Sequence, residues 1–313
     1  PGAQLVVLPL ADGGEGTAVI LARATGGELV PADASDPLGR PLRSHFAVLG
    51  DGMTAVVEMA AASGLALLDA DELDPLRSST RGTGELILAA LDRGLRHIIV
   101  AIGGSATNDG GMGMAYALGA RFLDAGGAEL KPCGEALGRV ASVNLSGLDH
   151  RLAGCEVVVA CDVANPLLGE EGATLVYGPQ KGAGAEELGL LEEGMARYAS
   201  VVEEAVGRRL SGLPGAGAAG GLGFGLMAFL GARAEPGIEV VMRMVGFMDE
   251  ARACDLMVTG EGRYDAQTAY GKTVAGVVRA ARELGKPLVI LVGAISDEAL
   301  TAGSVEGLCC LSI

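Results

Sequence analysis

Three apolar runs in this sequence each lead directly into a loop of glycines, hydroxyls and carboxylates. The loops are Ala11–Thr17 (ADGGEGT), Gly103–Gly111 (GGSATNDGG) and Gly260–Asp265 (GEGRYD). At the carboxyl end of a strand, bare backbone amides and the start of the next helix can hold an anion. Glycine lets the backbone approach that anion, while Asp, Glu, Ser and Thr supply metal ligands, acids or bases. The three loops predict an enzyme that handles a phosphorylated, acidic small molecule.

The loop Gly103–Gly111 is the strongest single signal, because it follows a buried strand at 97–102 and precedes a helix at 112–119. Its backbone amides and hydroxyls could cradle a phosphate. The candidate groups are those of Gly103, Gly104, Ser105 and Thr107. Asp109 could bind Mg²⁺ or accept a hydroxyl proton. The alternative is a long glycine-rich turn in which the Asn-Asp pair only caps the following helix.

The loop after the predicted strand at 255–259 combines two carboxylates with an arginine. Glu261 is a candidate metal ligand, and Asp265 is a candidate base for a substrate hydroxyl. Arg263 could bind a substrate carboxylate through two parallel hydrogen bonds. The alternative interpretation is ion pairing at a solvent-exposed surface.

Two further segments place polar side chains where helices begin. Asp12 and Glu15 precede a helix that starts near Gly16, so they could act on a substrate or simply cap that helix. Thr80 and Arg81 open another predicted helix among hydroxyls and glycines. Arginine is the residue best suited to bidentate contact with a carboxylate or phosphate, so this pair is a candidate substrate-binding site.

One glycine cluster imitates a dinucleotide-binding motif. Gly215, Gly217 and Gly220 match the spacing G-x-G-x-x-G. That motif requires a preceding strand, whereas a helix end and Pro214 precede the glycines here. The sequence leaves two alternatives open: a loop that packs tightly at a helix start, and a loop that contacts phosphate.

Lysine is scarce in this chain, which draws attention to two of its positions. The four lysines are Lys131, Lys181, Lys272 and Lys286. Lys181 and Lys272 both lie beside glycines, yet Lys272 is not part of a Walker loop, since Ala266 stands where that motif needs glycine. Either lysine could still offer its ammonium group to a phosphate. A solvated lysine at a helix start is the alternative for Lys272.

Composition argues against several classes of partner. The 313 residues carry a formal net charge of −16, with a pI near 4.6, which argues against nucleic acid and against anionic membrane surfaces. The uncharged segment 210–232 is long enough to span a membrane, but its eight glycines and Pro214 are typical of a loop. We therefore expect no membrane span.

The cysteines and histidines also restrict the chemistry. The six cysteines show no CxxC spacing, and we expect free thiols in the cytoplasm. His45, His97 and His150 all lie outside the glycine-rich loops, so a Ser-His-Asp or Cys-His nucleophile has no candidate histidine. Loops of amides, hydroxyls, carboxylates and few cations instead match phosphoryl transfer, where positioning and charge neutralisation carry the catalysis.

Buried Val/Ile/Leu runs that alternate with amphipathic stretches predict an α/β protein with a parallel sheet. Residues 28–60 differ, because their short alternating runs predict antiparallel hairpins. We expect a discontinuous Rossmann/flavodoxin-like domain from residues 1–35 and 240–313, and an inserted mixed α/β domain from 36–239. Strands are expected at 5–10, 97–102, 156–161, 255–259, 287–293 and 307–312. Because the sequence starts and stops at expected strands, we expect further sequence on either side of it. Helices are expected at 16–24, 82–93, 112–119, 185–208, 222–230, 247–253 and 272–284.

Eight sequence blocks together resemble the bacterial glycerate kinase family. They are 11–17, 58–64, 80–87, 103–111, 161–167, 178–182, 214–221 and 259–263, and they run in order over nearly the whole chain. The resemblance implies two α/β domains with the active site between them. It also implies ATP and Mg²⁺ as cofactors, and transfer of the γ-phosphoryl group to the 2-hydroxyl of D-glycerate. Family members also begin with a strand and an Asp-Ser-Phe-Lys-type loop and finish with a further helix, neither of which is in this sequence.

The resemblance does not say which carboxylate is the base, so the roles of the carboxylates are assigned from their neighbouring residues. Asp265 is the favoured base and Asp109 the favoured metal ligand, with Asp12 as a further catalytic candidate and Glu261 as a further ligand. The substrate would be held by Arg81, Arg263, Glu15 and Thr80, and the phosphates by Gly103, Gly104, Ser105, Thr107, Lys181, Gly215, Gly217 and Lys272. The expected partners are glycerate and a nucleotide, without nucleic acid or membrane, and a homodimer is one open assembly. The alternatives are a kinase of another small hydroxy acid and a non-catalytic anion-binding protein.

Overall fold

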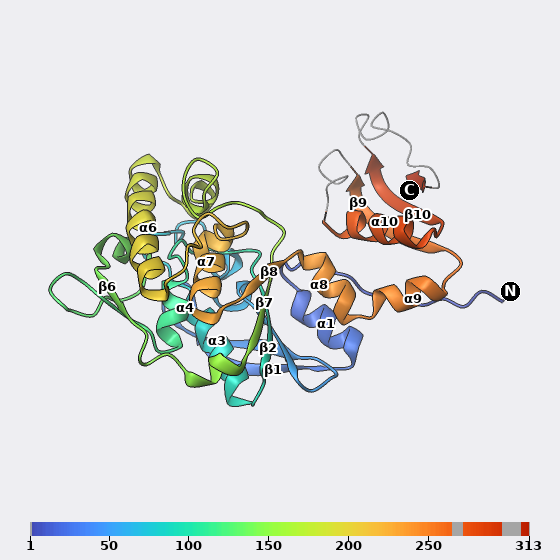
Figure 1. The fold of residues 1–313 in the computed structure, drawn as a ribbon. Helices are drawn as coiled ribbons and strands as arrows, with labels where there is room; N and C mark the ends of the chain where they lie inside the picture. The colour runs from blue at the N-terminus through green and yellow to red at the C-terminus, as the bar shows by residue number, and fades with distance from the viewer. Residues whose placement is uncertain (1, 265–271, 296–307, 313) are drawn as a thin grey trace. The chain divides into compact units, whose positions relative to one another are not determined.

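The computed structural model describes residues 2–264, 272–295 and 308–312. Contacts between residues divide the chain into two compact units (Figure 1). The larger unit is Gly13–Pro236, and the smaller unit combines Pro1–Asp12 with Gly237–Ile313. Each unit combines helices with strands, which confirms the α/β class predicted from the sequence.

A six-stranded mixed sheet organises the larger unit, in the order β1-β2-β3-β4-β7-β8. β1 (Glu28–Ser35), β2 (Pro41–Val48) and β3 (Thr54–Glu58) are antiparallel neighbours, which confirms the hairpins expected at 28–60. β3, β4, β7 and β8 then pair in parallel. The remaining strands are β4 (His97–Ala101), β7 (Glu156–Ala160), β8 (Arg233–Glu235) and the separate pair β5 (Arg121–Leu123) and β6 (Ser142–Asn144). β3, β4 and β7 are buried almost throughout, as is usual for parallel strands.

Five helices of the larger unit lie close to their expected positions, whereas α2 and α5 were not expected. They are α1 (Thr17–Thr25), α2 (Ala60–Ser63), α3 (Arg81–Asp92), α4 (Met112–Ala117), α5 (Ala173–Tyr177), α6 (Ala185–Val206) and α7 (Ala218–Leu230). Short 3-10 turns add η1 (Leu65–Leu67), η2 (Gly134–Arg139), η3 (His150–Gly154) and η4 (Pro179–Lys181). Gly26 ends α1 with a φ of 72°, the left-handed conformation common for glycine at a helix end. No described helix is both long enough and apolar enough to cross a membrane.

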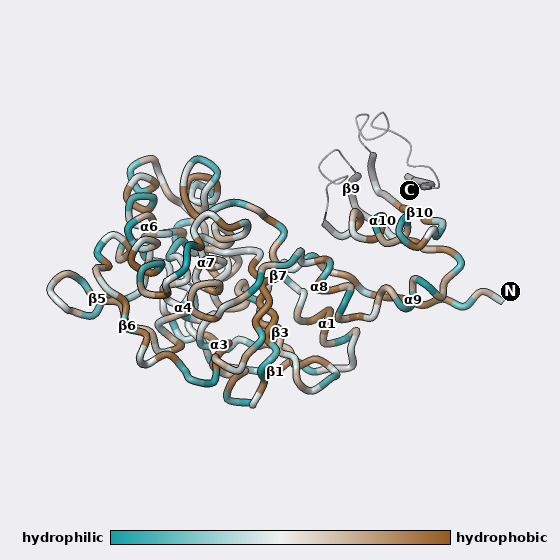
Figure 2. The backbone as a smooth tube through the Cα atoms, in the orientation of Figure 1, coloured by the Kyte–Doolittle hydropathy of each residue, from teal (hydrophilic) through white to brown (hydrophobic). Residues whose placement is uncertain are grey.

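The core of the larger unit is one cluster of buried side chains from the sheet and from the helices packed on it. Figure 2 shows β3 as one of its most hydrophobic segments. Four aromatic rings lie in a row, with neighbouring centroids 5.9–6.0 Å apart, in the order Phe229, Phe122, Tyr198 and Phe224. Such tilted and edge-on pairs add to the free energy gained from burying apolar surface.

The smaller unit is built on a three-stranded parallel sheet, in the order β11-β10-β9. Its strands are β9 (Met257–Tyr264), β10 (Leu288–Ile295) and β11 (Leu308–Ser312), which confirms the three strands expected in this region. The loop expected from Gly260 is wrong as far as Tyr264, because these residues pair with β10 and continue β9. Its helices are α8 (Gly237–Met244), α9 (Phe247–Ala253) and α10 (Lys272–Leu284). A separate hydrophobic core includes Ile238, Phe247, Val277, Leu288 and Ile290.

The segment Leu5–Leu10 differs from the prediction. Its apolar run predicts a strand, whereas the structure has no regular secondary structure there, and Leu5 and Val7 are 84% and 75% exposed. Leu8 and Leu10 pack against the core of the smaller unit. A strand needs a neighbour to satisfy its backbone hydrogen bonds, and no described strand pairs with this segment. The strand prediction is therefore wrong for this structure.

Candidate active site at the carboxyl edge of the sheet

The parallel strands of the larger unit all end at one edge of the sheet, called here the carboxyl edge. Glu58 ends β3 and lies in register with Ala101 of β4, which in turn lies in register with Ala160 of β7. The loops that follow these strands therefore gather at the same edge, which is where α/β proteins bind ligands. Residues 102–111 follow β4, and residues 161–166 follow β7.

Two of the three predicted loops meet at the carboxyl edge. The amide of Gly103 donates to the carbonyl of Gly13 at 3.5 Å, and a Cβ added to Gly103 would lie 2.8 Å from Cα of Gly14. Only glycine at position 103 permits this close approach of two backbones. Glu15 belongs to the same turn and is exposed, whereas Asp12 is partly buried. Both remain candidates for the roles predicted from the sequence.

Asp109 is fully buried and ties together the starts of two helices. Its carboxylate accepts hydrogen bonds from the Thr80 amide at 2.8 Å, the Thr80 hydroxyl at 2.9 Å and the Gly113 amide at 3.0 Å. The Gly111 amide at 3.1 Å and the Ser79 hydroxyl at 3.3 Å complete the set. Burial raises the pKa of this carboxyl, although these hydrogen bonds act in the opposite direction. The arrangement joins the N-termini of α3 and α4, the helix-capping alternative left open by the sequence.

The described surroundings of Asp109 do not form a ready-made magnesium site. Mg²⁺ requires hard oxygen ligands and usually keeps several waters, whereas both oxygens of the buried Asp109 face donors of the protein itself. Among residues 2–264, 272–295 and 308–312, no group of three or more His, Cys, Asp or Glu is placed to hold a metal ion. The metal-binding role of Asp109 stays a prediction.

Thr80 and Arg81 lie at the start of α3 in different environments. The buried hydroxyl of Thr80 donates to Asp109 and accepts from the Met114 amide at 2.9 Å. The side chain of Arg81 is half-exposed, with Nε donating to Glu85 at 2.8 Å. Of the two predicted substrate-binding residues, Arg81 is the one whose charge reaches the surface.

Lys181 is brought onto the loop Gly103–Gly111, where its contact Ser105 lies 76 residues away in sequence. Its ammonium group donates to the carbonyl of Thr107 at 2.6 Å and to the hydroxyl of Ser105 at 3.2 Å. The side chain is fully buried, and this burial lowers the pKa of Lys181 to about 7 even though the charge of Asp109 raises it. Three of the predicted phosphate-binding residues are therefore one connected group.

The glycine cluster at 215–221 packs against the same loop. The carbonyl of Gly220 accepts from the Gly110 amide at 3.0 Å, and a Cβ on Gly220 would lie 1.9 Å from the carbonyl oxygen of Thr107. A Cβ on Gly217 would lie 2.1 Å from the carbonyl oxygen of Pro166. The tight-packing alternative is confirmed, and contact of Gly215 or Gly217 with phosphate stays a prediction.

The remaining predicted residues belong to the smaller unit or fall outside the described part. Asp265 lies outside the described residues. Glu261, Arg263 and Lys272 have described backbones in β9 and α10, but their side chains lie outside the described set. Their predicted roles as base, metal ligand, carboxylate ligand and phosphate ligand are untested.

Glu58 is a residue of the carboxyl edge that the sequence interpretation missed. It is 5% exposed, and Oε1 accepts a hydrogen bond from the Ala18 amide in the first turn of α1. A carboxylate that directly ends an apolar strand is the signal that could have found it, because Glu58 ends the fully buried β3.

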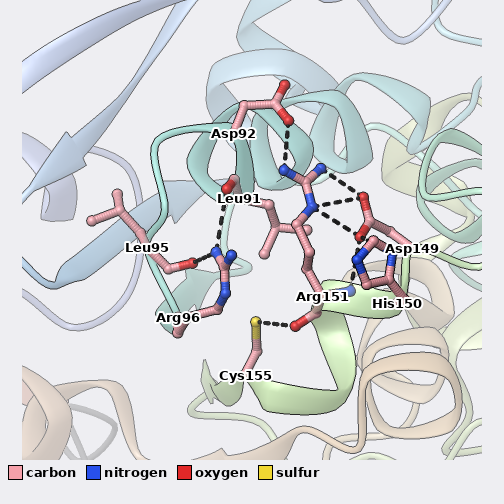
Figure 3. Close-up of polar contacts among 8 residues, drawn as sticks. All are labelled: Leu91, Asp92, Leu95, Arg96, Asp149, His150, Arg151 and Cys155. Carbon is pink, nitrogen blue, oxygen red and sulfur yellow. Dashed lines mark hydrogen bonds and ion pairs between the residues drawn. The ribbon is translucent and has the colours of Figure 1, made fainter.

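A second polar cluster of the larger unit is centred on Arg151 (Figure 3). Arg151 donates to Asp149 at 2.6 Å and pairs with Asp92 of α3 at 2.8 Å, which ties η3 to the end of that helix. Hydrogen bonds from Arg151 lower the pKa of Asp149 to about 2. The cluster lies beside His97 and Glu156, where β4 and β7 begin, so it belongs to the edge opposite the candidate site.

Comparison with known proteins assigns the chain to a family. The model of the glycerate kinase family matches residues 1–311. The chain belongs to the glycerate kinase family. Membership confirms the kinase and transferase classes predicted from the eight sequence blocks.

Individual relatives agree with this assignment. The chain is 50% identical to a glycerate kinase of Bacillus subtilis and 47% identical to a glycerate 2-kinase of Escherichia coli, in each case over 95% of this chain and 78% of the relative. A crystal structure of a protein assigned as glycerate kinase 2 from Salmonella typhimurium LT2 superposes with a TM-score of 0.89 at 45% identity. It covers 97% of this chain and 80% of that protein.

Proposed function

We propose that this chain transfers the γ-phosphoryl group of ATP to the 2-hydroxyl of D-glycerate and releases 2-phosphoglycerate and ADP. Family membership and the relative named glycerate 2-kinase support the proposal. The structural observation that carries it is the connected group of Lys181, Ser105 and Thr107 at the carboxyl edge. An amine beside hydroxyls and glycine amides suits a multiply charged phosphate.

The phosphates of the nucleotide are proposed to bind along the loop Gly103–Gly111. The backbone at Gly104 and the hydroxyls of Ser105 and Thr107 would supply donors, and Lys181 would supply positive charge from behind the loop. Gly103, whose amide donates to Gly13, would let the backbone approach the phosphates. Gly215, Gly217 and Lys272 are proposed as further phosphate contacts. Positioning and charge neutralisation of this kind account for most of the catalysis in phosphoryl transfer.

The glycerate is proposed to bind through its carboxylate to Arg81, with Arg263, Glu15 and Thr80 as further contacts. Asp265, with Asp12 as the other candidate, would accept the proton of the 2-hydroxyl. The bond from that oxygen to the γ-phosphorus forms as the bond to the β-phosphate oxygen breaks, and ADP leaves. ATP use follows from the kinase class, and Mg²⁺, with Glu261 as a candidate ligand, stays a prediction.

The two compact units are proposed to be the two α/β domains of the family, with the discontinuous unit being Rossmann/flavodoxin-like. The cytoplasmic location is supported by the free cysteines of the described part, Cys133, Cys155, Cys161 and Cys254. A homodimer stays an open assembly.

Phosphorus NMR tests the function directly. The full-length gene product is incubated with ATP and D-glycerate, with and without Mg²⁺, and D-lactate and L-glycerate serve as competing hydroxy acids. We expect ATP consumption with D-glycerate and a single new 2-phosphate ester. A 3-phosphate product would overturn the regiochemistry. Consumption of ATP with another hydroxy acid but not with glycerate would overturn the substrate, and no consumption with any acceptor would overturn the proposal.

A further inference from the structure

Glu58 combines a negative charge with an interior position at the centre of the carboxyl edge. It is 5% exposed, and its strand β3 is buried at every residue. A carboxylate removed from water is costly unless donors of the protein satisfy it. The group that donates a hydrogen bond to Glu58 therefore indicates the role of this buried carboxylate.

The donor to Glu58 is the amide of Ala18, 40 residues away in sequence. Ala18 is the second residue of α1, where backbone amides have no partner inside the helix. The N-cap residue of α1 is Gly16, which has no side chain to cap the helix. Glu58 supplies this cap from the sheet, and its negative charge also favours the positive end of the helix.

The turn Gly13–Gly16 directly precedes the capped helix α1 and packs against the loop Gly103–Gly111. Thr17 donates from its hydroxyl to the carbonyl of Gly14 at 2.7 Å, which closes the turn onto the start of the helix. The Gly13 carbonyl receives the Gly103 amide, and Gly14 packs on Gly103. The sheet holds the two sides of this contact together, because Met59, next to Glu58, donates from its amide to the carbonyl of Ala101 at 2.9 Å, two residues before Gly103.

We propose that Glu58 is a positioning residue of the active site. By capping α1 it holds the turn Gly13–Gly16, and with it Glu15, at a fixed place beside Gly103. The inference rests on the proposed function for its kinetic consequence, because Glu15 is proposed to contact glycerate. The loss of this cap should therefore weaken glycerate binding more than ATP binding, because Lys181 holds Ser105 and Thr107 of the loop independently of the turn.

Two substitutions at position 58 separate positioning from stability. Glu58→Ala removes the acceptor, and Glu58→Gln keeps an oxygen that can accept the same hydrogen bond. We expect Glu58→Ala to raise KM for glycerate about tenfold or more, with a smaller rise in KM for ATP, and Glu58→Gln to restore most of the loss. Asp149→Ala is the control, because it removes a hydrogen-bonded carboxylate at the opposite edge of the sheet and should lower stability without changing either KM.

Hydrogen–deuterium exchange of peptides covering residues 11–21 gives a readout that does not depend on activity. We expect Glu58→Ala to accelerate exchange at the start of α1, and Glu58→Gln and Asp149→Ala to leave it slow. Unchanged exchange in Glu58→Ala, or an equal rise of both KM values, would overturn the positioning role. If wild type transfers no phosphate while the exchange behaves as expected, the proposed function fails and the positioning of the turn stands.

Discussion

The buried amine of Lys181 predicts an unusual pH dependence of stability, which Lys181→Met should remove. Burial lowers the pKa of Lys181 to about 7 in the folded chain, against 10.5 for an exposed lysine. The unfolded chain therefore binds one more proton than the folded chain between pH 7 and about pH 10. Stability rises with pH wherever the unfolded state binds more protons, so Lys181 makes the protein less stable at pH 7 than at pH 9.

The magnitude follows from the two pKa values. A separation between 10.5 and about 7 corresponds to roughly 5 kcal/mol at 1.36 kcal/mol per pH unit. Integration over the range from pH 7 to pH 9 gives a gain of about 2 kcal/mol in the free energy of unfolding. Lys181→Met keeps the length and apolar stem of the side chain but has no titrating group. The hydrogen bonds lost to Ser105 and Thr107 cost the variant a similar amount at every pH, so they do not affect the slope.

Urea denaturation at several pH values between 7 and 9, followed by circular dichroism, measures this slope. We expect the free energy of unfolding of wild type to rise by about 2 kcal/mol relative to Lys181→Met over that range. Lys286→Met is the control, since Lys286 also donates to a backbone carbonyl, that of Cys254 at 2.6 Å, but is only partly buried. If the free energy of unfolding changed with pH equally in wild type and Lys181→Met, the burial of this amine against the loop Gly103–Gly111 would be refuted.

Two other predictions use matched pairs of variants. Arg81→Lys keeps the charge but loses the planar fork, so it should raise KM for glycerate about ten- to a hundredfold and hardly change KM for ATP. Arg93→Lys at the other end of α3 should change neither, and equal effects of the two variants would count against Arg81. Gly220→Ala and Gly231→Ala both strain a left-handed backbone, with φ of 64° and 65°, but only at position 220 does the new Cβ meet the Thr107 carbonyl, at 1.9 Å. Thermal unfolding should show that Gly231→Ala lowers the free energy of unfolding by about 1 kcal/mol and that Gly220→Ala lowers it by about 1–3 kcal/mol more. Equal decreases in the two variants would refute the tight packing at Gly220.

The positions of most helices and strands could be predicted from the sequence. Periodicity depends on local spacing, so the 22-residue α6 and the buried strands β4 and β7 are visible in the pattern of apolar residues. The segment Leu5–Leu10 shows the limit of that reasoning. Its pattern is that of a strand, but a strand also needs a partner, and pairing is a property of the assembled sheet.

The location of the candidate site was also predictable, because loops that follow parallel strands must gather at one edge. The sequence by itself determined that Gly103–Gly111 would lie there and that the chain resembles glycerate kinases. It could not determine which way each polar side chain points. Spacing specifies neighbours along one element, whereas hydrogen-bond partners that are far apart in the chain depend on how the elements pack.

Only the tertiary structure therefore decided the partners of the charged residues at the carboxyl edge. Asp109 points into the interior because the starts of α3 and α4 surround it with amides. Lys181 reaches Thr107 across 74 residues, and Glu58 reaches Ala18 across 40. Each is buried, and a buried charge is stable only where the fold brings donors or acceptors to it.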